Sequence, residues 1–353
     1  MTKTSIAAFI AFSVSIAAGR NLEIACRETG NAHAIVVAPS SEPSVRYAAE
    51  ELRDHVCLMT GVKMRIVSAL DENPGKSVFI RCDKQVAGDD GFRLKVEGDD
   101  LHIIGGVRGV LYGVYELLET YGGVGWFSSW HTVIPEKDSF SIPNDLDEVQ
   151  KPAFAMRATS WCDTIKSNCV FATRLRLNGG NGYSYNVPKG EQGKKFGGAS
   201  YCFGKGLGSC HTFKSLLPPE KYFKSNPEWF SEVNGKRKGA PTQLCLTNPE
   251  VLRIVTSNVL DRIRRDPEAR FFGVSQNDWK WFCTCRKCAA VDAEEESHSG
   301  TIIRFVNSIA EEVEKEFPNV FIETLAYTYS RKPPKKTKPR HTISWFGKLC
   351  IRI

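Results

Sequence analysis

The second half of the chain alternates short apolar runs with longer amphipathic stretches, and this alternation restricts its fold more than any other feature. Apolar residues recur at helical spacing over residues 249–265 and 301–317, and Pro249 stands where the first residue of a helix would. Strand-length apolar runs occupy residues 271–275 and 320–326. Strands that alternate with helices of this length predict an α/β protein with a parallel sheet or a (β/α) barrel.

The first part of the chain predicts a separate, smaller α+β domain. An apolar strand at 34–38 precedes a helical pattern that Gly61 ends, and residues 92–96 and 101–104 fit the two strands of a hairpin. A second helical pattern stops at Gly122, and a polar stretch with several prolines follows. We therefore expect four parts: a signal peptide at 1–19, an α+β domain at 20–135, a linker at 136–152 and an incomplete (β/α)8 barrel at 153–353.

The N-terminus predicts export. A basic start and an unbroken run of apolar or small residues from 5 to 18 include, at 15–19, the small side chains that a signal peptidase accepts. At about fourteen residues, the run is too short to cross a bilayer core of about 30 Å as a helix. No later stretch is long enough to span a membrane. The expected location is therefore secreted or periplasmic, and the alternative interpretation of the run is a buried N-terminal helix.

The composition and charge of the chain restrict the kinds of molecule that we expect it to bind. With 42% hydrophobic and 25% charged residues, the chain has the composition of an ordinary globular protein. Its formal charge of +7 comes partly from one basic, proline-containing run at 331–340, which predicts a solvated loop. No aromatic and basic motif accompanies this charge, so nucleic-acid binding is not expected.

Polar side chains abruptly replace apolar ones at the end of the strand predicted at 271–275. The next residues are Gln276, Asn277, Asp278 and Trp279. Active sites of barrel enzymes are built at the carboxyl ends of the strands. Amides hydrogen-bond sugar hydroxyls, an indole covers an apolar sugar face, and a carboxyl group can transfer or orient a proton. The pattern fits a sugar site, and an aspartate that caps a loop beside a core tryptophan fits it equally.

Three further residues are candidates for substrate binding. His211 stands between a glycine-rich stretch and a Pro-Pro pair, although a lone histidine is more often structural than catalytic. The glycines there do not match a phosphate-binding loop. Tyr327 follows the strand predicted at 320–326, and Trp161 ends a strand predicted at 154–161. Aromatic rings at strand ends can be sugar platforms, and packing in the core explains them as well.

Twelve cysteines are scattered along the chain, and Cys283, Cys285 and Cys288 form the one compact cluster. In an exported chain they can form disulfides, while their spacing also fits a structural metal site completed by His298 or a distant cysteine. Free thiols are the third possibility. Three thiolates usually close a metal site, so neither a catalytic metal nor a cofactor is expected. In each case the cluster braces the loop that follows Asp278.

Several longer motifs carry a resemblance to a known family. Those of the second half, besides the cysteine cluster, are Gly273-Val-Ser-Gln-Asn-Asp-Trp279, Ser299-Gly-x-x-x-Arg-Phe-Val-Asn307, Thr324-Leu-Ala-Tyr327 and Gln243-Leu-Cys-Leu-Thr-Asn-Pro-Glu250. Together they resemble the bacterial domain of unknown function numbered 4838. Two motifs of the first part resemble the small domain that precedes the barrel in α-glucuronidases and β-hexosaminidases: Arg46-Tyr-Ala-Ala-Glu-Glu-Leu52 and Arg108-Gly-x-Leu-Tyr-Gly-Val-Tyr115.

This resemblance implies a glycoside hydrolase-like barrel, related to the endo-β-N-acetylglucosaminidases of glycoside hydrolase family 163 and more distantly to families 20 and 67. Family 20 enzymes carry an adjacent Asp-Glu pair after the corresponding strand, where this chain has Asn277, Asp278 and Trp279. A second carboxyl group would have to come from a later strand. Family members continue beyond the lysine- and proline-rich run, so we expect a C-terminally truncated barrel with roughly five of its eight strands and little activity by itself.

The expected function is hydrolysis of O-glycosyl bonds in glycans that contain N-acetylhexosamine or uronic acid. Asp278 is the expected catalytic residue. The expected partner is a glycan or polysaccharide, and the alternative is a glycan-binding protein that transfers no proton. The residues expected to bind substrate are Gln276, Asn277, Trp279, His211, Tyr327 and Trp161.

Overall fold

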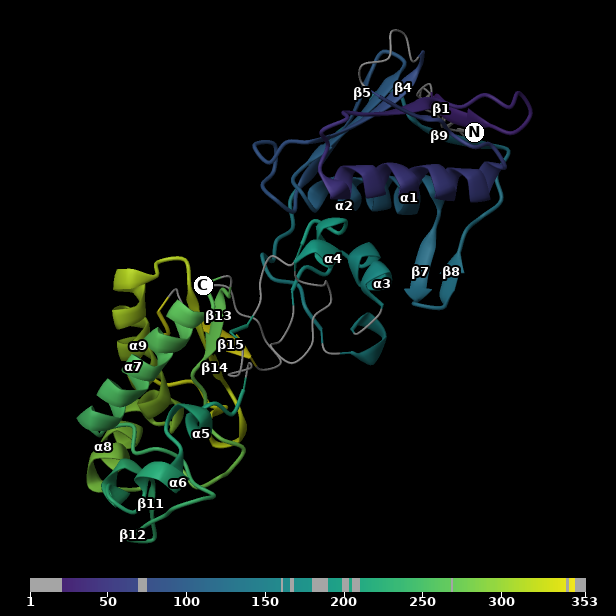
Figure 1. Ribbon diagram of the computed structural model, residues 1–353. Helices are drawn as coiled ribbons and strands as arrows, with labels where there is room; N and C mark the ends of the chain where they lie inside the picture. Colours follow the sequence, from purple (N-terminus) through teal and green to yellow (C-terminus); the bar gives the residue numbers. More distant parts are fainter. Residues whose placement is uncertain are drawn as a thin grey trace, which may run out of the picture. The chain divides into compact units, whose positions relative to one another are not determined.

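A computed structural model of the chain describes residues 21–68, 75–159, 161–165, 168–179, 190–198, 203–204, 210–267, 269–340 and 343–346. The predicted signal peptide at 1–19 lies outside these residues. The chain divides into two compact units, Met1–Phe127 with His131–Pro152 and Ser128–Trp130 with Ala153–Ile353. Figure 1 labels the elements of both units.

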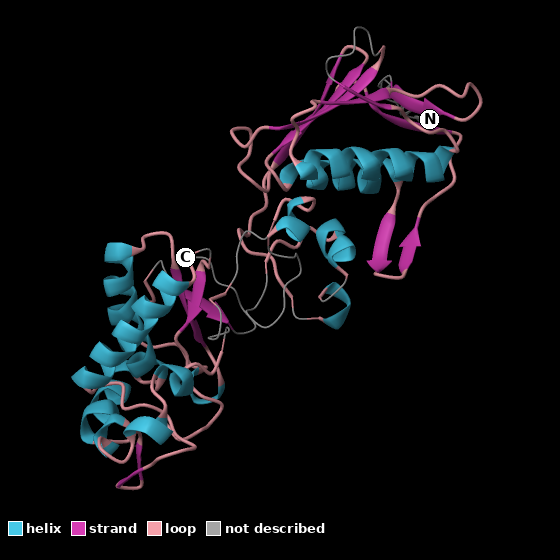
Figure 2. Ribbon diagram, in the orientation of Figure 1, coloured by secondary structure: helices cyan, strands magenta, loops and turns pink. Residues whose placement is uncertain are grey.

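A six-stranded sheet forms the first unit (Figures 1 and 2). Four of its strands run parallel, and the predicted hairpin is confirmed as its antiparallel part. The strand order is β10 (Asp147–Gln150), β5 (Phe92–Glu97), β6 (Asp100–Gly105), β4 (Ser77–Cys82), β2 (Ala34–Val37) and β3 (Ile66–Ser68). Two further strand pairs are β1 (Asn21–Cys26) with β9 (Ser139–Pro143) and β7 (Gly125–Ser128) with β8 (His131–Val133).

Helices α1 (Pro43–Thr60) and α2 (Gly109–Leu117) pack together against one face of this sheet (Figure 1). α1 begins with a proline in its first turn and buries apolar residues that recur every three or four positions. Gly61 ends α1 in the left-handed conformation, with φ 76°, and its N–H donates to the carbonyl of Cys57. α2 continues into one π-helical turn, Leu118–Gly122. Both predicted helices are therefore confirmed.

Residues 136–152, predicted as a linker, instead contain β9 and β10. Phe140 and Ile142 alternate with serines along β9, and both are buried. β10 pairs with β5, and Asp147 accepts two hydrogen bonds of 2.7 Å from the Arg93 side chain across that pair. The linker prediction was wrong because strands of four or five residues, flanked by prolines and polar residues, are too short to show a clear period.

A three-stranded parallel sheet lies in the second unit. β14 (Phe321–Leu325) runs between β13 (Phe271–Gly273) and β15 (Ile343–Phe346). A parallel bridge from Phe203 to Phe271 adds one more segment beside β13. The described residues confirm a mixed α/β fold and do not close a barrel, so the (β/α)8 barrel stays a prediction.

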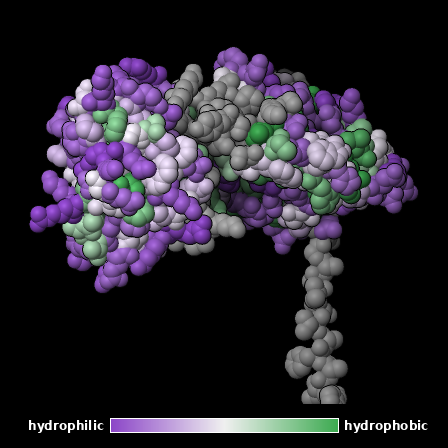
Figure 3. All heavy atoms as spheres, turned by 90° about the horizontal axis from the view of Figure 1, so that it is seen from below, coloured by the Kyte–Doolittle hydropathy of each residue, from purple (hydrophilic) through white to green (hydrophobic). Residues whose placement is uncertain are grey.

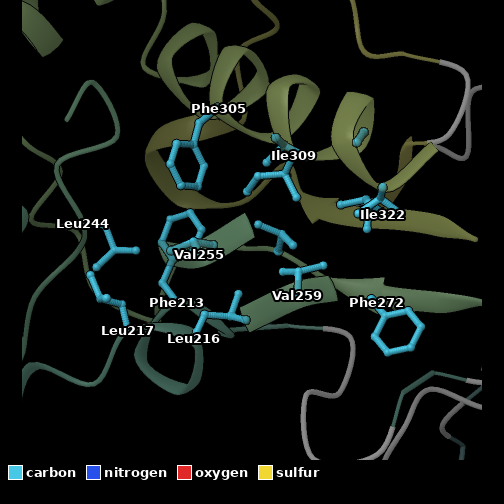
Figure 4. Packing of buried hydrophobic residues seen from close by; sticks show 14 of the residues in the cluster. Phe213, Leu216, Leu217, Leu244, Val255, Val259, Phe272, Phe305, Ile309 and Ile322 are labelled. Carbon is cyan, nitrogen blue, oxygen red and sulfur yellow. The ribbon is translucent and has the colours of Figure 1, made fainter. Parts of the chain in front are cut away.

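Helices α7 (Pro249–Arg265) and α9 (Ser299–Glu316) pack with this sheet. Val259 of α7 and Ile309 of α9 meet Ile322 of β14 in the core that Figure 4 shows. Within the described ranges, no helix has the length and apolarity needed to cross a bilayer. The shorter elements of this unit are α3 (Cys169–Arg174), α4 (Glu191–Lys194), α5 (Phe213–Leu216), α6 (Pro219–Tyr222), α8 (Arg286–Glu295), β11 (Glu232–Val233), β12 (Lys236–Arg237) and the 3-10 turns η2 (Cys162–Thr164), η3 (Pro227–Trp229) and η4 (Thr328–Ser330).

The strand predicted at 154–161 is not formed by its described residues. Phe154 and Trp161 are 56% and 55% exposed, so the apolar side chains of this segment bury no common face. Trp161 instead directly precedes η2. The prediction was wrong because it took the apolar residues of this segment as a sign of a buried strand, whereas Phe154 and Trp161 are exposed.

The basic run 331–340, predicted as a solvated loop, is tied to α8 and α9. Glu295, fully buried at the end of α8, accepts hydrogen bonds from the backbone N–H groups of Lys336 and Thr337, at 2.8 and 3.0 Å, and from the Arg304 side chain. Burial raises the pKa of Glu295, but hydrogen bonds led by that of Thr337 outweigh it and lower the pKa to about 2. Three basic side chains of the run also form ion pairs with acidic residues of these helices or their ends.

Glu323 is fully buried in the middle of β14. Among the described residues, neither of its carboxyl oxygens has a hydrogen-bond partner. Its register partner on β13 is Gly273, which has no side chain. Burial raises the pKa of Glu323 well above its ordinary value, because it penalises the charged form of the carboxyl group.

Replacing Leu52 by alanine should strongly destabilise the first unit, because the side chain is 0% exposed in α1. We expect Leu52→Ala to lower the free energy of unfolding by about 2–5 kcal/mol, measured by urea denaturation. Leu58 lies on the same helix and is 63% exposed. Leu58→Ala is the matched control, and we expect it to change the free energy by less than about 0.5 kcal/mol. Equal effects of the two substitutions would contradict the described packing of α1.

Replacing Glu323 by glutamine should make stability less dependent on pH. In the unfolded chain the carboxyl ionises above a pKa of about 4.5, whereas burial raises this pKa in the fold, so the wild type loses stability as pH rises above the unfolded value. The free energy of unfolding of Glu323→Gln should therefore rise relative to wild type between about pH 4 and about pH 8. Urea denaturation at both pH values measures this difference. Glu312→Gln, at an exposed helix position, is the control, and parallel pH profiles for wild type and Glu323→Gln would contradict the prediction.

Candidate functional site

The pairing of β13 with β14 brings two predicted strand ends to one edge of the sheet. The strands are parallel, with Gly273 opposite Glu323, and the N–H of Val274 donates to the Glu323 carbonyl at 2.7 Å. The segment with Asp278 follows β13, and Tyr327 follows β14. Because parallel strands end on the same side, the two segments emerge side by side.

His211, Asp278 and Tyr327 come together at this edge. Nε2 of His211 lies 4.0 Å from Oδ1 of Asp278. The rings of His211 and Tyr327 meet edge to face, with centroids 5.6 Å apart. The negative charge of Asp278, and a hydrogen bond with it, raise the pKa of the Tyr327 hydroxyl. The Asp278 side chain is 63% exposed, so the group is open to a ligand from solvent.

Backbone geometry holds His211 in place. Its φ of 57° is left-handed, a conformation uncommon for residues other than glycine. Nδ1 lies 3.0 Å from the carbonyl oxygen of Gln276. A carbonyl only accepts hydrogen bonds, so Nδ1 carries the hydrogen, and the lone pair of the neutral ring is on Nε2, toward Asp278. The neighbouring Thr212 fixes the contact, because its Oγ1 accepts from the N–H of Ser275 at 2.9 Å.

The side chain of Gln276 is buried and used within the protein. Its Nε2 donates to Oγ1 of Thr328 at 3.0 Å, and its Oε1 accepts from Oγ of Ser330 at 2.5 Å. Both partners belong to η4, the turn that follows Tyr327. Gln276 therefore ties the end of β13 to the turn after β14.

The side chain of Asn277 is buried and used in the same way. Its Oδ1 accepts from the N–H of Lys214 at 2.8 Å, and its Nδ2 donates to the Thr242 carbonyl at 2.8 Å. The Gln243 side chain accepts from the Asn277 N–H at 2.9 Å and donates to the carbonyls of Asn277 and Trp279 at 2.8 and 2.7 Å. Sequence reasoning did not assign Gln243 a role, although this residue opens one of the family motifs.

Exposed aromatic rings adjoin Asp278 in the sequence. Trp279 is 44% exposed and Trp281 is 39% exposed, with Nζ of Lys238 4.4 Å from the centre of the Trp281 ring. On the face seen in Figure 3, most of the surface is hydrophilic and hydrophobic residues form small separate patches. Trp161, predicted to be equivalent to Tyr327, does not follow a strand in the structure.

The cysteine cluster gains a fourth member in the structure. Cys245 joins Cys283, Cys285 and Cys288, and the four sulfur atoms all lie within 4.8 Å of one another. All four thiols are buried and free. A hydrogen bond between Cys245 and Cys283 lowers the pKa of Cys245 and raises that of Cys283 to about 12. Among the described residues, this group of side chains has the spacing to hold a metal ion, with Cys245 as the distant cysteine of the sequence hypothesis.

His298, the other predicted fourth ligand, is engaged elsewhere. Its Nδ1 lies 2.6 Å from Oδ2 of Asp292, and its ring lies 3.7 Å, centroid to centroid, from that of Phe282. The imidazole is thus engaged by a hydrogen bond with Asp292 and a tilted ring contact with Phe282.

Comparison with solved structures finds similar folds at low sequence identity. Among solved structures, the fold resembles a family GH115 4-O-methyl-α-glucuronidase with specificity for decorated arabinogalactans, at 13% identity and a TM-score of 0.48, over 92% of this chain and 45% of that one. It also resembles the GH20 β-N-acetylhexosaminidase of Streptomyces coelicolor, at 12% identity and a TM-score of 0.46, over 93% of this chain and 66% of that one. A third similar structure is the β-N-acetylhexosaminidase of Bacteroides fragilis, at 11% identity and a TM-score of 0.44, over 93% of this chain and 67% of that one.

Sequence comparison, unlike these structural similarities, identifies the family of the chain. The chain spans less than two thirds of the first two of these structures. No curated protein matches it in sequence. Residues 126–346, more than half of the chain, match the family described as Domain of unknown function (DUF4838). The chain therefore belongs to the DUF4838 family.

Proposed function

We propose that the protein acts on glycans at the edge formed by His211, Asp278 and Tyr327, and hydrolyses O-glycosyl bonds next to N-acetylhexosamine or uronic acid. One observation carries this proposal: an exposed carboxylate, an imidazole and a phenol converge where two parallel strands end. The location that accords with the predicted signal peptide is outside the cytoplasm.

Each side chain has a defined part in the proposed reaction. Asp278 exchanges a proton with the glycosidic oxygen or orients the substrate, because its carboxylate is open to solvent. Nε2 of His211 lies 4.0 Å from Oδ1 of Asp278 and offers a second polar group to a bound sugar. The Tyr327 hydroxyl, with its raised pKa, stays protonated and can donate to a sugar oxygen. The exposed indole of Trp279 offers a flat face to a sugar ring.

Gln276 and Asn277 enter the proposal as positioning residues. The sequence suggested that their amides bind sugar hydroxyls, but their side chains are buried and hydrogen-bonded to the protein. We assign them the task of fixing the backbone from which Asp278 projects.

Glycan binding without hydrolysis is the second candidate function. Glycosidases generally use two carboxyl groups, about 5–9.5 Å apart, at the scissile bond. The segments that follow β13 and β14, residues 274–279 and 326–330, contain one carboxyl group, that of Asp278. Glu323 is fully buried and cannot touch a glycan in this conformation. A site with one exposed carboxylate and several aromatic rings is well suited to binding alone.

Asp278→Asn separates the two functions. If the proposal holds, chromogenic aryl N-acetyl-β-glucosaminides or aryl glucuronides are hydrolysed, and the substitution lowers kcat/KM by roughly 100-fold or more because the proton-transferring group is lost. Binding of the matching oligosaccharides, measured by calorimetry, should change much less. Asp261→Asn, at an exposed position of α7, is the control and should leave both unchanged.

The other outcomes are equally informative. Oligosaccharide binding without hydrolysis by any preparation supports the second candidate. Hydrolysis that survives Asp278→Asn contradicts the assigned role of Asp278. A chain that is folded and binds none of these glycans contradicts both functions.

Trp279→Ala should weaken glycan binding under either function. Loss of an indole that stacks on a sugar face removes about 0.5–1.5 kcal/mol, so we expect an increase in Kd of roughly 2-fold to 10-fold. Trp130→Ala is the matched control, because Trp130 belongs to the same unit and is also exposed. Equal effects of the two substitutions, measured by calorimetry with one oligosaccharide, would contradict a stacking role for Trp279.

A further inference from the structure

The four clustered cysteines come from two segments that are far apart in the sequence. Cys245 lies in the loop before α7, whereas Cys283, Cys285 and Cys288 lie just before α8 and in its first turn. Cys285 is the residue that precedes the first helical position of α8.

The sulfur–sulfur distances distinguish between the bonding states of these cysteines. Sγ of Cys245 lies 3.7 Å from Sγ of Cys285 and 3.9 Å from Sγ of Cys288. A disulfide joins its sulfur atoms at about 2.05 Å. Four sulfurs around Zn²⁺, with bonds of about 2.3 Å in a tetrahedron, lie about 3.8 Å apart. The observed spacing is therefore that of ligands around one metal ion, and it is too long for a disulfide.

Hydrogen-bond donors surround the sulfur atoms. The N–H of Glu232 donates to Sγ of Cys283 at 3.3 Å, and the Arg237 guanidinium donates to the same atom at 3.7 Å. Oγ1 of Thr247 lies 3.2 Å from Sγ of Cys288. Such contacts from outside the ligand set orient metal-bound thiolates. The charge of Arg237 also offsets part of the −2 charge that four thiolates and one divalent ion carry together.

We propose that Cys245, Cys283, Cys285 and Cys288 bind one Zn²⁺ ion as a tetrahedral structural site. Four thiols give up four protons to the solvent as they bind the ion, and nothing is oxidised or reduced. Four protein ligands fill the coordination sphere, so no position is left for a substrate or a water molecule. The role of the ion is therefore to hold the fold.

The zinc ion would join the two segments that position Asp278. Gln243, two residues before Cys245, holds the backbone of Asn277 and Trp279 on either side of Asp278. Cys283 follows Asp278 by five residues. The ion would thus fix the position of Gln243, which holds the backbone around Asp278, and also of the residues that follow Asp278 in the chain.

Metal analysis of the full chain tests this proposal without any assay of glycan activity. The protein is purified under reducing conditions, without chelators and without metal-affinity chromatography, and its metals are counted by mass spectrometry. We expect about one zinc ion per chain. Cys245→Ser should lose the zinc, whereas Cys82→Ser, at an exposed cysteine outside the cluster, should retain it.

A second measurement on the wild-type chain covers the case in which Cys245→Ser fails to fold. Replacing the bound ion by Co²⁺ should give the intense visible bands of tetrahedral cobalt and a near-ultraviolet band of thiolate-to-cobalt charge transfer. The four thiols should resist alkylation until a chelator is added. A chain that contains no zinc and binds no Co²⁺ at these cysteines would overturn the proposal. Stoichiometric iron in place of zinc would overturn the choice of metal.

Discussion

The side-chain amide of Gln243 is the interaction on which the candidate site depends. It makes three hydrogen bonds to the backbone of Asn277 and Trp279. It thereby satisfies backbone groups of an irregular loop, as a neighbouring strand satisfies those of a strand in a sheet. Buried backbone groups without partners are costly, so a loop that turns away from a parallel strand needs such substitutes. The amides of Gln276 and Asn277 complete the same network from the other side. This network fixes the backbone on both sides of Asp278, while the Asp278 side chain itself stays exposed.

The sequence predicted the fold well wherever a periodic pattern of apolar residues extended over many positions. The helices at 249–265 and 301–317 and the hairpin of the first unit appear close to the predicted positions, because each buries one apolar face over several turns or residue pairs. The sequence also predicted strands before Asp278 and before Tyr327, and both residues follow a strand in the structure. Short strands such as β9 gave no comparable signal, and residues 154–161 were apolar without being buried.

The sequence could not give the partners of the polar residues at the site. His211 lies 67 positions before Asp278, and Cys245 lies 38 positions before Cys283, so neither contact leaves a local pattern. Composition suggested that the amides of Gln276 and Asn277 face a ligand, whereas both side chains are buried. The Gln276 amide bonds to the hydroxyls of Thr328 and Ser330, and the Asn277 amide bonds to backbone groups. An amide has the same donors and acceptors in both settings, and only the fold decides which partner it finds.

The buried Glu295 has a consequence for how the sheet of the second unit is assembled. β14 and β15 are parallel neighbours, and a parallel pair must close a long connection before its first ladder bond forms. Glu295 binds that connection at Lys336 and Thr337, and the helix preceding β14 holds it again at Arg340. The connection is thus fastened at intermediate points, so the loop that remains to be closed is short. Ion pairs of Lys335, Lys336 and Arg340 with acidic residues of α8, α9 or their ends hold the same connection along its length.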